Sequence, residues 1–196
     1  MALLSLLSPE AAIARAAPDS TEPHAEETGR HEQVLFAFEG DGQPGRWVIV
    51  NDGVMGGLSS SRMVLGENGT AVFHGEVSLA NNGGFASVRS RPGAMPTAGS
   101  SRLVVRIRGD GRQYQLCVRT AETFDGIAYR WDFATRAGEW MTIEAPYRDF
   151  VPTFRGRVLR DVPPIDPAAI RQFGFLIADE VEGPFRLEID WIKAVE

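Results

Sequence analysis

An all-β sandwich or barrel is the fold class that this sequence predicts. From Gln33 onward, short runs alternate between apolar and polar residues, as in half-buried strands. Gly, Pro, Asn and Asp separate these runs at the short spacing of sheet proteins with many turns. The length of 196 residues, 43% of them hydrophobic, suits one globular domain with a core and a tail. We therefore expect a tail over residues 1–32 and a single β domain over residues 33–196.

The alternating segments define the expected strands in chain order. They are 34–40, 69–79, 84–91, 101–120 as a hairpin, 126–135, 138–147, 171–179 and 184–195. In the 101–120 hairpin, Asp110-Gly111 supplies the turn. Its expected core positions are Leu103, Val105 and Ile107, answered by Tyr114, Leu116 and Val118. A second hairpin is expected over 171–195, turning at Glu182-Gly183.

The remaining segments differ in composition. Residues 148–170 contain four prolines, which suit neither a strand nor a helix interior, so we expect a long ordered loop. Within it, Asp166 as N-cap and Pro167 at the first helical position predict one short helix. Residues 1–32 have no periodicity and predict a disordered tail or a targeting segment.

Charge and cysteine content limit the partners. A net charge of -6 argues against nucleic acid, because binding phosphates requires a basic surface. No apolar run is long enough for a membrane-spanning helix. The single cysteine, Cys117, excludes an internal disulfide, and its place in an alternating segment predicts a buried, inert thiol.

Catalytic and metal-binding motifs are not found. No nucleophile elbow, zinc-protease or phosphate-loop pattern is present, and His74 has no partner at motif spacing. The carboxylates, Asp52 among them, have ordinary contexts that predict solvated turns, although a paired-carboxylate site and a loop calcium stay open. We therefore expect no catalytic residue, no cofactor and no metal.

Binding is the better-supported activity. Alternation places Arg106 and Arg108 opposite the apolar face of the predicted 101–120 hairpin, with Arg119 on the same outward side. Arg89 would add to this face if its strand is adjacent. Such a face is either an ordinary exposed sheet surface or one that grips carboxylates, sugar hydroxyls or a partner's backbone. Trp47, Trp131 and Trp140 are interpreted as core residues, with sugar stacking as the alternative.

Two glycine-rich blocks stand apart from the strands. "VNDGVMGGLSSS" (50–61) frames Met55 with glycines, and "NNGG" (81–84) is a second tight-turn element. In a β-sandwich the connections gather at the ends, so the two blocks are expected near each other. Met55 would then be either a plug over the core or an adaptable contact for a hydrophobic partner.

These blocks also carry a family resemblance. "WVIVNDGVMGGLSSS" (47–61) and "FHGEVSLANNGGFASVRS" (73–90) resemble the complex I intermediate-associated protein family, the thirty-kilodalton assembly-factor type. The resemblance continues through "RGDGRQYQLCVRT" (108–120), "APYRDFVPTFRGR" (145–157) and "IRQFGFLIADEVEGPFRLEIDWI" (170–192).

The resemblance implies a galactose-binding-like jelly-roll sandwich. It also implies a chaperone-like, non-enzymatic role in assembling respiratory NADH:ubiquinone oxidoreductase or a related membrane redox complex. The expected partners are subunits or intermediates of that complex, with peripheral membrane association and carbohydrate binding left open. A jelly-roll carbohydrate-binding module is the alternative function.

Location and site residues complete the expectations. Without a convincing transit peptide, we expect a bacterial-type member that is cytoplasmic or at the inner membrane surface, with the mitochondrial matrix or periplasm as alternatives. The expected partner-binding residues are Asp52, Met55, Gly56, Gly57, Asn81, Asn82, Gly83, Gly84, Phe85, Arg89, Arg106, Arg108, Arg119 and Arg155.

Overall fold

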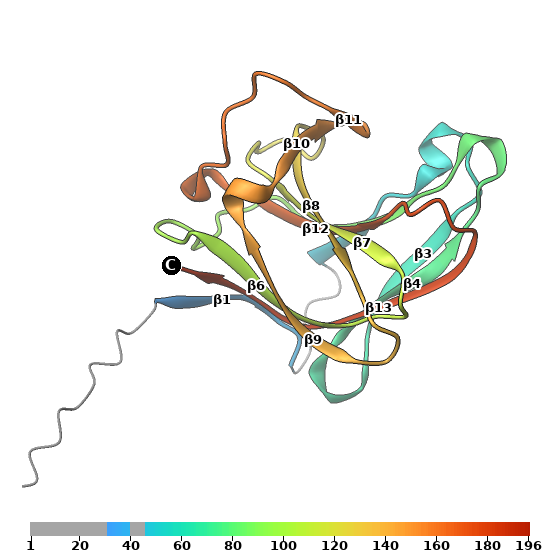
Figure 1. Cartoon of the computed structure of the whole chain (residues 1–196), viewed down its shortest axis with the longest axis horizontal. Helices are drawn as coiled ribbons and strands as arrows, with labels where there is room; N and C mark the ends of the chain where they lie inside the picture. Colours follow the sequence, from blue (N-terminus) through green and yellow to red (C-terminus); the bar gives the residue numbers. More distant parts are fainter. Residues whose placement is uncertain (1–30, 40–45) are drawn as a thin grey trace, which may run out of the picture.

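Two antiparallel sheets pack face to face in the computed structural model, which describes residues 31–39 and 46–196 (Figure 1). The first sheet contains β1 (Glu32–Ala37), β3 (Ser60–Leu65), β4 (Ala71–Val77), β6 (Arg102–Arg108), β9 (Trp140–Pro146) and β13 (Gly183–Val195). The second contains β2 (Trp47–Ile49), β5 (Ala86–Ser90), β7 (Gln113–Arg119), β8 (Ala128–Ala134), β10 (Val151–Phe154), β11 (Arg157–Val158) and β12 (Gln172–Ile177). This is the predicted jelly-roll sandwich.

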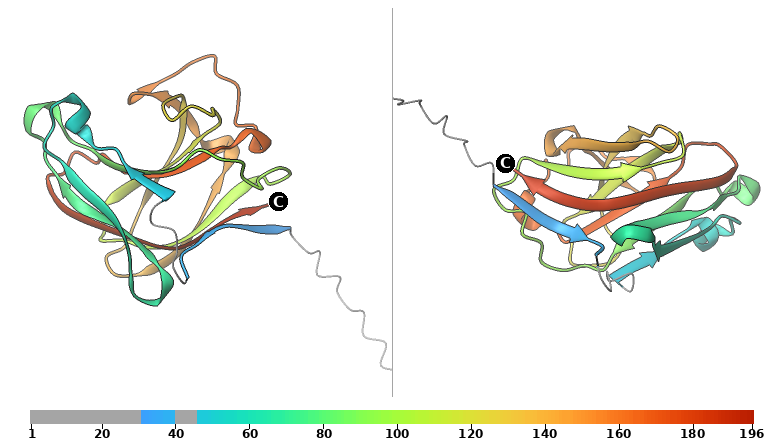
Figure 2. Two further views of the ribbon diagram at one scale, coloured as in Figure 1. Left: turned by 180° about the vertical axis from the view of Figure 1, so that it is seen from behind. Right: turned by 90° about the horizontal axis from the view of Figure 1, so that it is seen from below.

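The long strand β13 organises the first sheet, whose order is β3-β4-β13-β6-β9. Along one of its edges β4 pairs with residues 183–189 and β1 with residues 191–195, while β6 covers the other edge. Consequently β1 lies beside the C-terminal end of the chain (Figure 2). The second sheet has the order β11-β10-β8-β7-β12-β5-β2.

The core lies between the two sheets. Its fully buried side chains include Phe73, Leu103 and Ile189 from the first sheet, and Leu116 and Phe175 from the second. Burying one such side chain contributes roughly 1.5–3 kcal/mol before entropy is subtracted. The alternation in the sequence therefore identified the inward faces of the strands correctly.

Both predicted hairpins are wrong. β6 belongs to the first sheet and β7 to the second, and β12 and β13 are divided in the same way. Leu103 and Leu116 thus both point into the core, but from opposite sheets and not as neighbours in one sheet. Alternation shows which side chains point inward, but it does not distinguish a hairpin from an arch that joins facing sheets.

The segment expected to be a long loop also contains two short strands, β10 and β11. They extend the second sheet beyond β8, and Pro152 opposes Tyr129 in β8. Proline is tolerated near a sheet edge, where fewer ladder hydrogen bonds are needed. The short helix predicted after Asp166 is a single 3-10 turn, η6 (Pro167–Ala169), and the Asp166 side chain caps it as predicted. Other single turns are η2 (Asp52–Met55), η3 (Glu67–Gly69), η4 (Ala80–Asn82) and η5 (Tyr147–Asp149).

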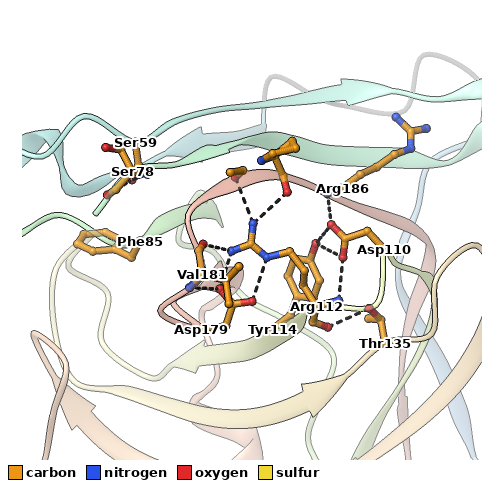
Figure 3. A network of polar contacts seen from close by, with 12 residues as sticks. Ser59, Ser78, Phe85, Asp110, Arg112, Tyr114, Thr135, Asp179, Val181 and Arg186 are labelled. Carbon is orange, nitrogen blue, oxygen red and sulfur yellow. Dashed lines mark hydrogen bonds and ion pairs between the residues drawn. The ribbon is translucent and has the colours of Figure 1, made fainter. Parts of the chain in front are cut away.

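A buried ion pair holds the arches at one end of the sandwich together (Figure 3). Arg112, in the β6–β7 connection, donates to both carboxylate oxygens of Asp179, at 2.9 and 2.6 Å. It also donates to the carbonyl of Val181 in the β12–β13 connection and to those of Gly183 and Pro184 at the start of β13. Burial raises the pKa of Asp179, but the hydrogen bonds and charge of Arg112 outweigh it and hold that pKa below its ordinary value.

A second carboxylate at this end, Asp110, ties the same arches. It accepts from the Tyr114 hydroxyl at 3.0 Å and from the backbone N–H of Arg186 at 2.7 Å. Burial, together with the Asp110 charge, raises the pKa of Tyr114, which therefore stays protonated and able to donate. Arg112 and Asp110 thus stabilise the two connections that cross between the sheets.

We expect Arg112→Lys to lower the free energy of unfolding by about 2 kcal/mol, because an ammonium cannot reproduce the bidentate pair and the carbonyl contacts together. Urea unfolding of the two proteins measures the difference. Arg136→Lys is the matched control, since Arg136 is exposed and pairs only with exposed Glu139. Equal losses in both variants would contradict this role of Arg112.

Candidate functional site

Two connections converge at the same end of the sandwich. η2 lies between β2 and β3, and η4 lies between β4 and β5. We call residues 52–58 together with residues 79–85 the tip. The Asn81 side chain donates across it to the Gly56 carbonyl at 3.3 Å. The structure thus brings together the two glycine-rich blocks.

Asp52 joins the two halves of the tip. Its side chain is fully buried, and Oδ1 accepts from the Ser59 N–H at 3.0 Å. Oδ2 accepts from the Ser59 hydroxyl at 2.5 Å, from the Gly84 N–H at 2.8 Å and from the Phe85 N–H at 3.3 Å. The interpretation of Asp52 as a solvated turn residue is therefore wrong.

The charge of Asp52 is stable in this setting. Burial alone raises the pKa of its carboxyl, but the hydrogen bonds from Ser59, Gly84 and Phe85 outweigh it, so the pKa lies below the ordinary 3.8. Asp52 is therefore ionised at neutral pH, and its buried oxygens accept hydrogen bonds from within the protein.

The tip glycines fit around this carboxylate. A Cβ on Gly57 would lie 2.4 Å from the Asp52 Cγ, and one on Gly83 would lie 2.6 Å from its Oδ2. Gly56 and Gly84 have φ of 90° and 125°, which side chains rarely adopt. The glycines are therefore required by the tight packing and backbone conformation of the tip, which is not a flexible linker.

Large apolar side chains project from the outside of the tip. Val54, Met55 and Leu58 are 76%, 65% and 64% exposed, and Leu79 is 43% exposed. Met55 is therefore not a plug over the core. An apolar group carried on a fixed backbone is a typical protein-contact surface.

The predicted arginines separate into two groups. Arg106 and Arg108 lie on the outer face of the first sheet, where both guanidinium groups stack on Trp140 and Arg108 pairs with Glu188 at 2.7 Å. Arg89 and Arg119 lie in the second sheet, and Arg155 is near it, 3.8 Å from Asp125. The prediction of one shared arginine face is wrong, because β6 and β7 are in different sheets.

The sequence did not reveal several residues in or directly beside the tip. Ser59, the main partner of Asp52, appeared only as part of a serine run, although its hydroxyl also bonds the Ser78 backbone. Val54, Leu58 and Leu79 were also missed as exposed contacts. Their position in glycine-rich turns could have indicated exposure, because a tight turn has too little surrounding structure to bury several apolar side chains.

Two negative findings apply to the described residues. Within 31–39 and 46–196, no three His, Cys, Asp or Glu side chains are grouped so that they could hold a metal ion. Over the same ranges, no helix has the length and apolar character to span a bilayer.

Residues 36–189 match the family described as Complex I intermediate-associated protein 30 (CIA30), and the chain belongs to this family. The Drosophila melanogaster protein named "Complex I intermediate-associated protein 30, mitochondrial" is 28% identical, over 81% of this chain and 61% of its own length. The Mus musculus protein of the same name is also 28% identical, over 82% of this chain and 55% of its own length. This chain thus spans little more than half the length of these relatives.

Solved structures support the fold. A family 11 carbohydrate-binding module from Clostridium thermocellum, solved with a mixed-linked tetrasaccharide, superposes with a TM-score of 0.59. The match covers 84% of this chain and 95% of the module, at 19% identity. At this identity the likeness shows the galactose-binding-like jelly roll alone.

We expect Asp52→Asn to lower the free energy of unfolding by roughly 2–4 kcal/mol, since either orientation of the amide places its NH₂ against a backbone N–H. The exposed Asp149→Asn is the control. Because the pKa of Asp52 is lowered on folding, its contribution is complete above the unfolded value and is lost as pH falls through the folded value. The free energies of unfolding of the wild type and of Asp52→Asn should therefore become more similar as the pH is lowered from neutral into acid. A difference that stays constant with pH would contradict the assignment.

Gly57→Ala should destabilise the protein by about 1–3 kcal/mol, because the added methyl collides with the Asp52 carboxylate. Gly53→Ala is the matched control in the same loop, since a Cβ there meets nothing within 4 Å. Thermal unfolding of the pair checks this. A similar loss at both positions would mean that the loop needs flexibility and not space.

Proposed function

We propose that this chain is a non-enzymatic assembly factor that binds a subunit or intermediate of respiratory complex I, or of a related membrane redox complex, through the tip. Family membership supports the class of function. The observation that carries the proposal is the exposure of Val54, Met55 and Leu58 on a backbone fixed by the buried Asp52.

A tip that is ordered before binding lowers the entropic cost of binding a partner. A loop that must become ordered on binding loses conformational entropy, whereas a preformed loop does not. The hydrogen bonds of Asp52 order the tip before any partner arrives. Met55 adds an adaptable, polarisable contact that can fit an incompletely folded apolar segment. This combination suits chaperone-like binding of an assembly intermediate.

The carbohydrate-binding alternative has weaker support. Trp47 is buried in the core and Trp131 packs against it, while Trp140 lies beneath Arg106 and Arg108. These side chains are therefore engaged within the protein and are not free platforms for sugar rings. Calorimetric titration with mixed-linked glucan oligosaccharides tests the alternative directly.

The compartment is part of the same proposal. The curated relatives carry "mitochondrial" in their names, which supports the matrix alternative among the expected locations. A cytoplasmic position at the inner membrane surface is the corresponding proposal for a bacterial host. Fractionation followed by protease protection would separate both from the periplasm.

We expect Met55→Ser combined with Val54→Ser to reduce recovery of complex I subunits at least tenfold in affinity purification under mild detergent. Loss of two buried apolar side chains from an interface is sufficient for such a change. The control is Val158→Ser, which removes a 58% exposed apolar side chain from β11 at the far edge of the second sheet. Equal recovery with all three proteins would contradict the tip as the binding surface.

A further inference from the structure

The outer face of the second sheet carries a cluster of arginines separate from the tip. Strand pairing places Arg89 opposite Gly174, Gly174 opposite Cys117, and Cys117 opposite Arg130, in one row across four strands. Arg119 follows two residues after Cys117 and so points to the same face. We call Arg89, Arg119 and Arg130 the arginine cluster. In Figure 1, β10–β11 and the tip rise at opposite edges of this face.

Cys117 lies in this row, and the charges of all three guanidinium groups act on its thiol. Burial raises the pKa of the Cys117 thiol, and the charges of Arg119, Arg89 and Arg130 lower it without overcoming the effect of burial. The thiol is therefore neutral at physiological pH. The Cys117 thiol therefore supplies no negative charge to offset the three arginines.

The cluster has more donors than acceptors. Arg119 is only 6% exposed, yet its Nε and Nη1 have no hydrogen-bond partner among the described residues, and neither has Nε of Arg130. Asp125 lies 3.9 Å from Arg89, and Asp132 lies 3.7 Å from Arg130, both beyond hydrogen-bonding distance. Buried charged donors are almost always paired, so this arrangement is unusual.

Repulsion between the arginines of the cluster is only partly compensated. Burial and the neighbouring charge of Arg119 lower the pKa of Arg89 to about 10. Asp125 opposes this effect, but its side chain is 58% exposed and is shared with Arg155. A bound anion would relieve both the repulsion and the unsatisfied donors.

We propose that the arginine cluster binds the phosphate group of a small phosphate monoester. A phosphate dianion accepts several charge-assisted hydrogen bonds, and guanidinium groups match its oxygens in paired geometry. The net charge of -6 disfavours a polyanion, which leaves a small ligand. The Phe124 ring, which lies over Arg89 at 5.6 Å and is 38% exposed, offers an apolar wall for the organic part.

The test is calorimetric titration of the full chain with orthophosphate and with phenyl phosphate, at constant ionic strength set by chloride. Both ligands should bind, and phenyl phosphate should bind more tightly because it also contacts Phe124. Arg119→Met should weaken both at least tenfold, since it removes two donors. This variant should fold normally in phosphate-free buffer because it removes a buried, unpaired charge.

Controls separate this site from general charge effects and from the tip. Arg148→Gln removes an 85% exposed arginine and should leave both affinities unchanged, and so should Met55→Ser. If Arg119→Met does not fold, Arg89→Gln provides the same comparison. No binding above the chloride background, or equal affinity in the wild type and the cluster variant, would overturn the proposal.

The Phe124 wall has its own outcome. Phe124→Ala should weaken phenyl phosphate and leave orthophosphate unaffected. If the wild type binds both ligands equally, the ligand is free phosphate and the monoester assignment is wrong. Because the cluster and the tip are on different parts of the molecule, this result is independent of the proposed partner.

Discussion

The buried carboxylate of Asp52 is the interaction on which the tip depends. A carboxylate removed from water is unstable unless its oxygens are fully engaged, and here they accept from Ser59, Gly84 and Phe85. These donors come from both connections, so satisfying one charge fixes two loops at once. Gly57 and Gly83 leave the space that this requires. The exposed apolar side chains outside are thus held in position at no further ordering cost.

Buried polar side chains also fix the β6–β7 and β12–β13 connections. Arg112 and Asp110 bind backbone groups in and beside the two connections: Arg112 donates to the carbonyls of Val181, Gly183 and Pro184, and Asp110 accepts from the N–H groups of Arg112 and Arg186. Connections that join facing sheets have no ladder partners of their own, so side chains must provide the hydrogen bonds. Figure 3 draws this network together with Ser59, Ser78 and Phe85. Gly183, whose carbonyl Arg112 binds, pairs with Val77 in β4, two residues before the tip segment 79–85 begins.

Much of the fold was predictable because alternation depends on burial alone. The inward residues Leu103, Ile107, Leu116 and Val118 were all identified, as was the jelly-roll class through family resemblance. Sheet membership was not predictable, because an inward face looks the same in a hairpin and in an arch. The tip was recognised from its glycines, but the role of Asp52 was missed. Two of its four hydrogen-bond donors are backbone groups 32 and 33 residues away, and these leave no local signature.

In this account, the chain presents an ordered apolar tip to a partner in complex I assembly. The most direct test is photo-crosslinking in cells, with a photoreactive residue at position 55 and, for comparison, at position 158. Mass spectrometry of the crosslinked products identifies the contacts at each site. The account predicts subunits or assembly intermediates of complex I at position 55 and their absence at position 158. The same proteins at both positions, or none of these subunits at position 55, would contradict it.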